Sequence, residues 1–175
     1  MNAFRVVYAD PPWRFRDRLP GPKRGAAKHY RTLSLSEIMR FPLPPIADDA
    51  WLFLWRTHTH QREAMQVMEA WGFRYASEIV WVKVSKNGRP LLGMGHTVRQ
   101  SHEVCIVGRR GRPKQRTKAI GSVILAPRRL HSVKPTHMYD LIEAFTPGPY
   151  LELFARARRP GWHSIGDQLE EAHDV

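Results

Sequence analysis

Short apolar runs alternate along the chain with segments in which apolar residues recur every three or four positions. Trp51–Trp55 holds five consecutive apolar residues, which predicts a strand buried on both faces of a sheet. From Ala64 the apolar residues fall at i, i+3, i+4 and i+7, which predicts a helix that ends at Gly72. The same spacing from Met138 predicts another helix, which a Pro-Gly pair at 147–148 ends.

The remaining elements follow from shorter signals. Ser34 and Glu37 have the spacing of a capping box, which predicts a short helix near Glu37–Arg40. Strands are predicted at Phe4–Tyr8, Tyr75–Val84, Val104–Val107, Val123–Leu125, Leu151–Ala155 and Trp162–Ile165, and loops at Ser85–Arg99 and Arg109–Lys118. Strands that alternate with helices predict an α/β fold with a mostly parallel sheet and helices on both faces.

The composition narrows the class of protein. The length of 175 residues predicts one domain over 1–175. The single cysteine excludes a disulfide framework and a Cys-based zinc site, and the nine histidines lack metal-ligand spacing, so we expect no metal site. No apolar run approaches the roughly 20 residues of a membrane span, and the N-terminus has no secretory pattern. We therefore expect a cytoplasmic protein without a membrane contact, either a monomer or a homodimer.

The charge adds a partner to this picture. The chain carries 28 Lys and Arg residues against 16 Asp and Glu, a net charge of +12, which predicts nucleic acid as a partner. The basic clusters at Arg14–Arg31 and Arg109–Lys118 are expected to flank the ligand-binding edge of the sheet and to track phosphates. In the second cluster the proposed phosphate contacts are Arg110, Arg112, Lys114 and Arg116. The alternative is a solvated face without a ligand.

The segment with the clearest chemistry is Asp10-Pro11-Pro12-Trp13, which directly follows the first predicted strand. Ligands of open α/β sheets bind at the carboxyl ends of the strands. There Asp10 and the carbonyl group of Pro11 can accept the two hydrogens of an exocyclic amine, and Trp13 offers a flat face for a base, worth roughly 1–3 kcal/mol. The alternative is a proline turn with a solvated Asp and a packed Trp. The preceding strand and the basic flanks favour a functional site.

This tetrapeptide resembles the signature of the MT-A70 family of adenine-N6 methyltransferases, which use S-adenosylmethionine. Further segments resemble that family in the same order: Tyr30–Leu33, Trp51–Trp55, Gly93–Arg99, His102-Glu103, His131–Pro135, Leu151–Arg156 and Gly166–Leu169. The catalytic motif precedes the cofactor motifs, as in the permuted order of that family. The resemblance implies a Rossmann-like methyltransferase fold with Asp10, Pro11, Pro12 and Trp13 as catalytic residues.

The resemblance also implies the cofactor site, made of Asp10, Lys134, Phe154, Arg156, Asp167 and Gln168. Lys134 would meet the methionine carboxylate, since a cation beside a helix start suits an anion. Arg156 would contact the carboxylate or the ribose, whereas Phe154 could equally be core. Asp167 and Gln168 would bind the ribose hydroxyls, although the family usually has Asn where Asp167 stands. Eukaryotic members place an acidic residue for the cofactor adenine well upstream of the catalytic turn; only nine residues precede Asp10, so we expect this contact to be missing or to be supplied by the C-terminal segment.

The expected reaction is methyl transfer to the N6 amine of adenine in DNA or RNA, with the target base unpaired or flipped. The candidate contacts to the nucleotide are Trp13, Tyr30, Arg99 and Glu103. Glu103 could instead order the Arg99 loop or be a solvent-facing charge beside a strand. One alternative is a catalytically inactive nucleic-acid-binding subunit of the same fold, but such subunits lose the Asp or the Trp that this chain keeps. The other is a methyltransferase for cytosine N4, which presents a similar planar amine.

Overall fold

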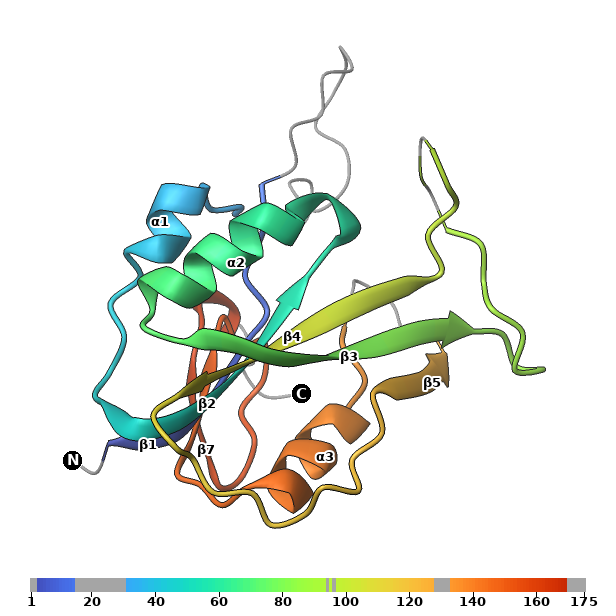
Figure 1. Ribbon diagram of the computed structural model, residues 1–175. Helices are drawn as coiled ribbons and strands as arrows, with labels where there is room; N and C mark the ends of the chain where they lie inside the picture. Colours follow the sequence, from blue (N-terminus) through green and yellow to red (C-terminus); the bar gives the residue numbers. More distant parts are fainter. Residues whose placement is uncertain (1–2, 15–30, 94, 96, 128–132, 170–175) are drawn as a thin grey trace.

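A computed structural model describes residues 3–14, 31–93, 95, 97–127 and 133–169 of the chain (Figure 1). Its strands form one seven-stranded sheet in the order β5-β3-β4-β2-β1-β6-β7. Their bounds are β1 Phe4–Ala9, β2 Ile46–Arg56, β3 Arg74–Val84, β4 His102–Arg110, β5 Val123–Pro127, β6 Tyr150–Leu153 and β7 Trp162–Ile165. Each predicted strand is present, and β2 is longer than its apolar run because it also includes polar residues at both ends.

The sheet is mixed but mostly parallel, as predicted. Strand β1 pairs in parallel with β2 and β6, and the pairs β6–β7 and β3–β5 are also parallel. Strand β4 lies between β2 and β3 and is antiparallel to both. The other strands therefore share one direction, and their carboxyl ends lie at one edge of the sheet, the carboxyl edge, together with the first residues of β4.

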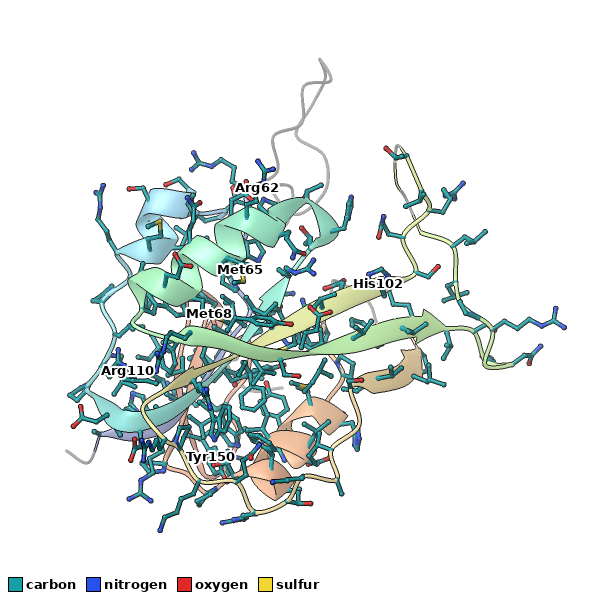
Figure 2. The ribbon with its side chains drawn as sticks, in the orientation of Figure 1. Arg62, Met65, Met68, His102, Arg110 and Tyr150 are labelled. Carbon is teal, nitrogen blue, oxygen red and sulfur yellow. The ribbon has the colours of Figure 1, made fainter. Side chains whose placement is uncertain are left out.

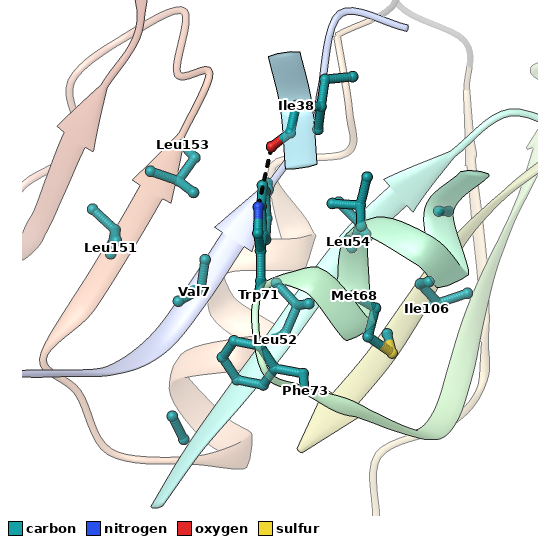
Figure 3. Close-up of a cluster of buried hydrophobic side chains, with 14 of the residues drawn as sticks. Val7, Ile38, Leu52, Leu54, Met68, Trp71, Phe73, Ile106, Leu151 and Leu153 are labelled. Atoms are coloured by element: carbon teal, nitrogen blue, oxygen red, sulfur yellow. Dashed lines mark hydrogen bonds between the residues drawn. The ribbon is translucent and has the colours of Figure 1, made fainter. Parts of the chain in front are cut away.

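Helices cover both faces of the sheet, which confirms that part of the prediction. On one face α1 (Leu35–Met39) and α2 (Gln61–Ala70) pack over the sheet in a cluster that includes Leu52, Met68 and Ile106 (Figure 3). In the same cluster Trp71 Nε1 donates to the carbonyl oxygen of Ile38 at 3.1 Å, which joins the two helices. On the other face α3 (His137–Phe145) packs in a second cluster with Tyr8, Phe53 and Trp55.

The predicted helix boundaries hold to within three residues. Ser34 and Glu37 form the capping box, with Glu37 N to Ser34 Oγ at 3.3 Å and Ser34 N to Glu37 Oε2 at 2.7 Å, so α1 begins earlier than Glu37. After α2, Gly72 has φ +80°, a left-handed conformation that suits glycine at a helix end. Short 3-10 helices lie at His58–His60 (η2) and Asp167–Leu169 (η4).

Several predicted strand boundaries differ from the structure by two or more residues, and two of these differences affect the positions of predicted site residues. Strand β6 ends at Leu153 and not at Ala155, because Phe154 adopts φ +61° and breaks the strand geometry. The second basic cluster is not a loop throughout, since β4 continues to Arg110.

The position expected for this cluster is also wrong. Because β4 is antiparallel, the segment after Arg110 leaves the sheet at the amino edge, opposite the carboxyl edge (Figure 2 labels His102 and Arg110 at the two ends of β4).

Arg110 has a structural role at that edge. Its Nη2 donates to the carbonyl oxygen of Trp71 at 2.6 Å and its Nε to that of Gly72 at 3.3 Å, so the guanidinium satisfies carbonyl groups at the end of α2. The guanidinium also lies 5.1 Å from the centre of the Phe73 ring. These contacts do not favour Arg110 as a phosphate ligand.

Replacing Arg110 by alanine should therefore destabilise the fold, by about 1.5 kcal/mol, the lower end for hydrogen bonds to a charged group. Unfolding in urea measures this difference. Arg109→Ala is the matched control, because Arg109 is exposed, and it should change the free energy of unfolding by less than about 0.5 kcal/mol. Equal effects of the two substitutions would refute the capping role.

Candidate active site

The topology of the sheet selects the place where a ligand binds. The chain leaves β1 toward β2 on one side, and it leaves β6 toward β7 on the other. In open α/β sheets such a reversal between neighbouring strands opens a crevice at their carboxyl ends. The segment 10–13 follows β1 and the segment 154–156 follows β6, so the two lie at this crevice.

A cavity of about 490 Å³ occupies this place, a size typical of small-molecule sites. It is lined by residues from three distant parts of the chain, among them Asp10, Lys134, Tyr139, Glu152, Phe154 and Arg156. The structure thus brings together Asp10, Lys134, Phe154 and Arg156, four of the residues that the sequence assigned to the cofactor site. Phe154 also packs on Phe41, with ring centres 4.7 Å apart.

The last two residues of the predicted cofactor site lie in η4. Asp167 is exposed and is not among the residues that line the cavity. Gln168 belongs to the same 3-10 turn, and its side chain lies outside the described atoms. The turn is held beside the cavity because Gly166 lies against Ala155, where an added Cβ would come within 2.1 Å of the Ala155 carbonyl oxygen.

Lys134 is the electrostatic centre of the site. Its ammonium lies 2.8 and 2.7 Å from the two carboxylate oxygens of Asp10 and 3.2 Å from Glu103 Oε2. Arg156 Nη2 is 3.9 Å from the same Asp10 carboxylate. The side chain of Lys134 is only 10% exposed, so these charges interact in a partly desolvated environment.

The pKa values follow from this arrangement. Burial alone would lower the pKa of Lys134, but Asp10 and Glu103 outweigh it and raise the pKa of the ammonium above its usual value. Burial would raise the pKa of Glu103, but Lys134 and Lys83 outweigh it and hold that pKa below its usual value. Both groups are therefore charged at neutral pH.

Glu103 is held by a cation on each side. Its Oε1 accepts from Lys83 Nζ at 2.5 Å, while Oε2 faces Lys134. Sequence reasoning missed Lys83, although the β3–β4 pairing sets Trp81 opposite Glu103 and so brings Lys83, two residues on, to the same face. Among the described residues Glu103 pairs with Lys83 and Lys134, whereas Arg99 Nε donates to the Gly93 carbonyl oxygen.

The expectation that Trp13 offers an open face for a base is wrong. It is 5% exposed, its Nε1 donates to the carbonyl oxygen of Trp55 at 3.0 Å, and its ring stacks on His60 with centres 5.1 Å apart. His60 Nε2 is 3.2 Å from the carbonyl oxygen of Arg14, and its Nδ1 is 2.7 Å from Thr57 Oγ1. The side chain of Trp13 therefore anchors the turn, and its ring is not an open platform for a base.

The backbone of the turn is also restrained. The carbonyl oxygen of Pro11 accepts from Trp13 N at 2.8 Å, and that of Pro12 accepts from Leu33 N at 2.9 Å. A carbonyl oxygen has two lone pairs, so Pro11 retains one acceptor site for an amine. The two proline rings fix their own φ angles, so Asp10 and Pro11 are held in a stiff segment.

Glu152 is a site residue that sequence reasoning missed. It is 7% exposed in the middle of β6, and Tyr139 Oη donates to its Oε1 at 2.7 Å. Its Oε2 has no hydrogen-bond partner within the part of the chain that the structure describes. Burial raises the pKa of this carboxyl to about 7. The signal in the sequence that could have identified Glu152 is an acidic residue inside an otherwise apolar four-residue strand.

Other predicted contacts lie elsewhere or outside the described residues. Tyr30 is in the part of the chain that is not described, as is most of Arg14–Arg31. Arg112, Lys114 and Arg116 lie beyond the amino edge, at the far end of β4 from Glu103. Within residues 3–14, 31–93, 95, 97–127 and 133–169, no group of three or more His, Cys, Asp or Glu could hold a metal ion. Among the described helices, none is long and apolar enough to cross a membrane.

Comparisons with known proteins add the relationships of the chain. A model of the MT-A70 family matches residues 4–168. The human N(6)-adenosine-methyltransferase catalytic subunit METTL3 is 34% identical over 179 residues, which cover 99% of this chain and 29% of the human protein. An Arabidopsis thaliana protein, N(6)-adenosine-methyltransferase MT-A70-like, is 34% identical over 97% of the chain and 24% of its own length. The type II methyltransferase M.MunI of Mycoplasma sp is 30% identical over 96% of the chain and 78% of its own length.

The raised pKa of Glu152 predicts how stability depends on pH. The folded protein keeps this proton up to about pH 7, whereas the unfolded chain releases it near 4.5, so stability falls as pH rises between these values. A rise from 4.5 to about 7 corresponds to roughly 3 kcal/mol. Relative to the parent, Glu152→Gln should therefore become more stable as pH increases, by up to that amount above pH 7. Urea unfolding at pH 5 and 8 tests this, and a difference that does not change with pH would contradict it.

Proposed function

This chain belongs to the MT-A70 family, and on that premise we propose that it transfers a methyl group from S-adenosylmethionine to the N6 amine of adenine in DNA or RNA. The family match confirms the resemblance seen in the Asp-Pro-Pro-Trp motif. The chain spans less than a third of the eukaryotic relatives but most of M.MunI. The observation that carries the proposal is the cavity at the reversal between β1 and β6, which unites Asp10 of that motif with Lys134, Glu152 and Arg156.

The residues that line the cavity fit S-adenosylmethionine and support a Rossmann-like methyltransferase fold. Lys134 and Arg156 supply positive charge for the methionine carboxylate. Glu152 Oε2, buried and without a partner among the described residues, would meet the methionine ammonium, whose positive charge would favour the ionised form of this carboxyl. The η4 turn with Asp167 and Gln168 follows Gly166, which lies against Ala155 between the cavity residues Phe154 and Arg156, and the turn would serve the ribose hydroxyls. When bound, S-adenosylmethionine supplies a methyl group on a positively charged sulfur.

The catalytic turn would orient the amine. Asp10 accepts one amine hydrogen and the remaining lone pair of the Pro11 carbonyl oxygen accepts the other, which directs the nitrogen lone pair toward the methyl group. Both acceptors are preorganised, because Lys134 holds Asp10 while Trp13 and His60 hold the turn. Glu103, which pairs with Lys134 and Lys83, lies next to the ion pair of Asp10 and would limit how the base can lie.

The decisive experiment measures transfer of tritium from labelled S-adenosylmethionine to matched DNA and RNA oligonucleotides, each single- and double-stranded. Nucleoside analysis of the product then distinguishes N6-methyladenine from N4-methylcytosine. Absence of transfer to every oligonucleotide, with nucleic-acid binding retained, would favour the inactive binding subunit instead.

Replacing Asp10 by alanine should lower the rate of methyl transfer by on the order of 10²–10³, the usual effect of losing one preorganised electrostatic contact. Asp10→Asn, which keeps the shape without the charge, should be similarly impaired. Turnover is measured with the oligonucleotide that the parent methylates best, and the thermal midpoint shows whether each variant is folded. Near-parental turnover in a folded Asp10→Ala protein would exclude this role.

Lys134→Ala should weaken the binding of S-adenosylmethionine by about 1.5–3 kcal/mol, as expected for one charge-assisted hydrogen bond. Calorimetric titration measures the dissociation constant. Lys83→Ala is the matched control, because it removes another ammonium from the same ion-pair network without removing a residue that lines the cavity. An equal loss of affinity for S-adenosylmethionine in the two variants would mean that Lys134 contributes only to the total charge of the ion-pair network and does not contact the cofactor.

A further inference from the structure

A strongly basic surface lies at the amino edge of the sheet, away from the catalytic turn. We call it the amino-edge surface and define it by five exposed cations: Arg5, Arg109, Arg112, Lys114 and Lys118. They come from the start of β1, the end of β4 and the segment that follows β4. The acids beside them include Asp48 and Asp49, near the start of β2, and Glu78, which lines a cavity together with Arg109 and Lys118, so the five cations outnumber these acids.

Three of these cations surround a hollow. Arg5, Arg112 and Lys114 line a depression of about 150 Å³, together with Asp49 and three uncharged residues. Asp49 is already engaged, since its Oδ1 accepts from Arg112 N at 2.6 Å. Three cations against one carboxylate form an environment that suits an anion with the dimensions of a phosphate group.

The segment that carries these cations is fixed, although it has neither helix nor strand. The carbonyl oxygen of Lys114 accepts from Trp51 Nε1 at 3.2 Å and from Thr146 Oγ1 at 2.9 Å. Arg116 N donates to the Phe145 carbonyl oxygen at 2.7 Å. Because the backbone is already ordered, binding an anion there immobilises only the side chains, which lowers its entropic cost.

This surface lies too far from the catalytic turn to contact the target nucleotide. Arg5 and Asp10 are at opposite ends of β1, and at the rise of a strand their Cα atoms are about 17 Å apart. A stacked, helical strand advances about 3.4 Å per nucleotide, so about five nucleotides of such a strand separate a base at Asp10 from a phosphate at Arg5, and an unstacked single strand, which is longer per nucleotide, needs fewer.

We propose that the amino-edge surface binds the sugar–phosphate backbone of nucleic acid at a distance from the methylated base, so that the protein favours substrates long enough to reach both places. The inference rests on the proposed function for its partner, and it names the substrate class as polymeric nucleic acid. Arg110 and Arg116 do not belong to the surface, because their guanidinium groups donate to backbone carbonyl oxygens of the protein.

The test combines Arg112→Ala, Lys114→Ala and Lys118→Ala in one variant. Its binding to an oligonucleotide of about 24 residues is measured by fluorescence anisotropy over a salt series, without cofactor. If each cation meets one phosphate, the slope of log K against log salt should flatten by about 2.7 on duplex or about 2 on single strands. The charge-conserving control, Arg112→Lys, Lys114→Arg and Lys118→Arg, should keep the slope.

A dinucleotide that contains adenine, too short to span the roughly 17 Å between the two places, is titrated in parallel by NMR. Its affinity should be the same for the parent and the alanine variant. An unchanged salt slope on the long oligonucleotide, or an equal loss of affinity at both lengths, would overturn the proposal. Both arms measure binding alone, so failure of methyl transfer would refute the proposed function and leave this test intact.

Discussion

The buried ammonium of Lys134 is the constraint on which the site depends. A charge that is removed from water is tolerated only beside opposite charge, so Lys134 requires Asp10 and Glu103 at the positions they occupy. Asp10 follows the last residue of β1, whereas Glu103 is the second residue of β4. The two carboxylates meet at one edge only because β4 runs against its neighbours. The antiparallel strand in the middle of the sheet is thus a condition for the ion pairs.

The direction of β4 also divides the basic residues of the chain. Its first residues complete the site at the carboxyl edge, and its last residues deliver Arg109 and the following segment to the opposite edge. One strand therefore connects the site to the amino-edge surface at a fixed separation. Because the strand is buried in the sheet, it holds this separation fixed. A flexible linker would instead allow the separation to vary with solvent or ligand.

Much of the fold could be predicted from the sequence, because strands and helices leave local patterns such as Trp51–Trp55 and the apolar spacing from Ala64. The direction of β4 could not be predicted, because its apolar run suits a parallel or an antiparallel strand equally. The wrong position predicted for the second basic cluster follows from this unknown direction. Spacing also gave no sign that His60 would cover Trp13, because the two come together only when β2 and β1 pair. Asp10 and Lys134 could be predicted as site residues from their residue types. Glu152 was not predicted, because it lies within a buried apolar strand.

The burial of Trp13 explains why the turn needs an aromatic residue even without an exposed ring. Asp10 and Pro11 can orient an amine only if their oxygens stay in place, and two prolines stiffen the chain without anchoring it to the sheet. The indole supplies the anchor through its hydrogen bond to the Trp55 carbonyl oxygen. That carbonyl belongs to β2, the strand beside β1, and His60, shortly after β2, covers the same ring. The acceptors for the amine are thus fixed from two directions, by the ion pair to Lys134 and by the neighbouring strand.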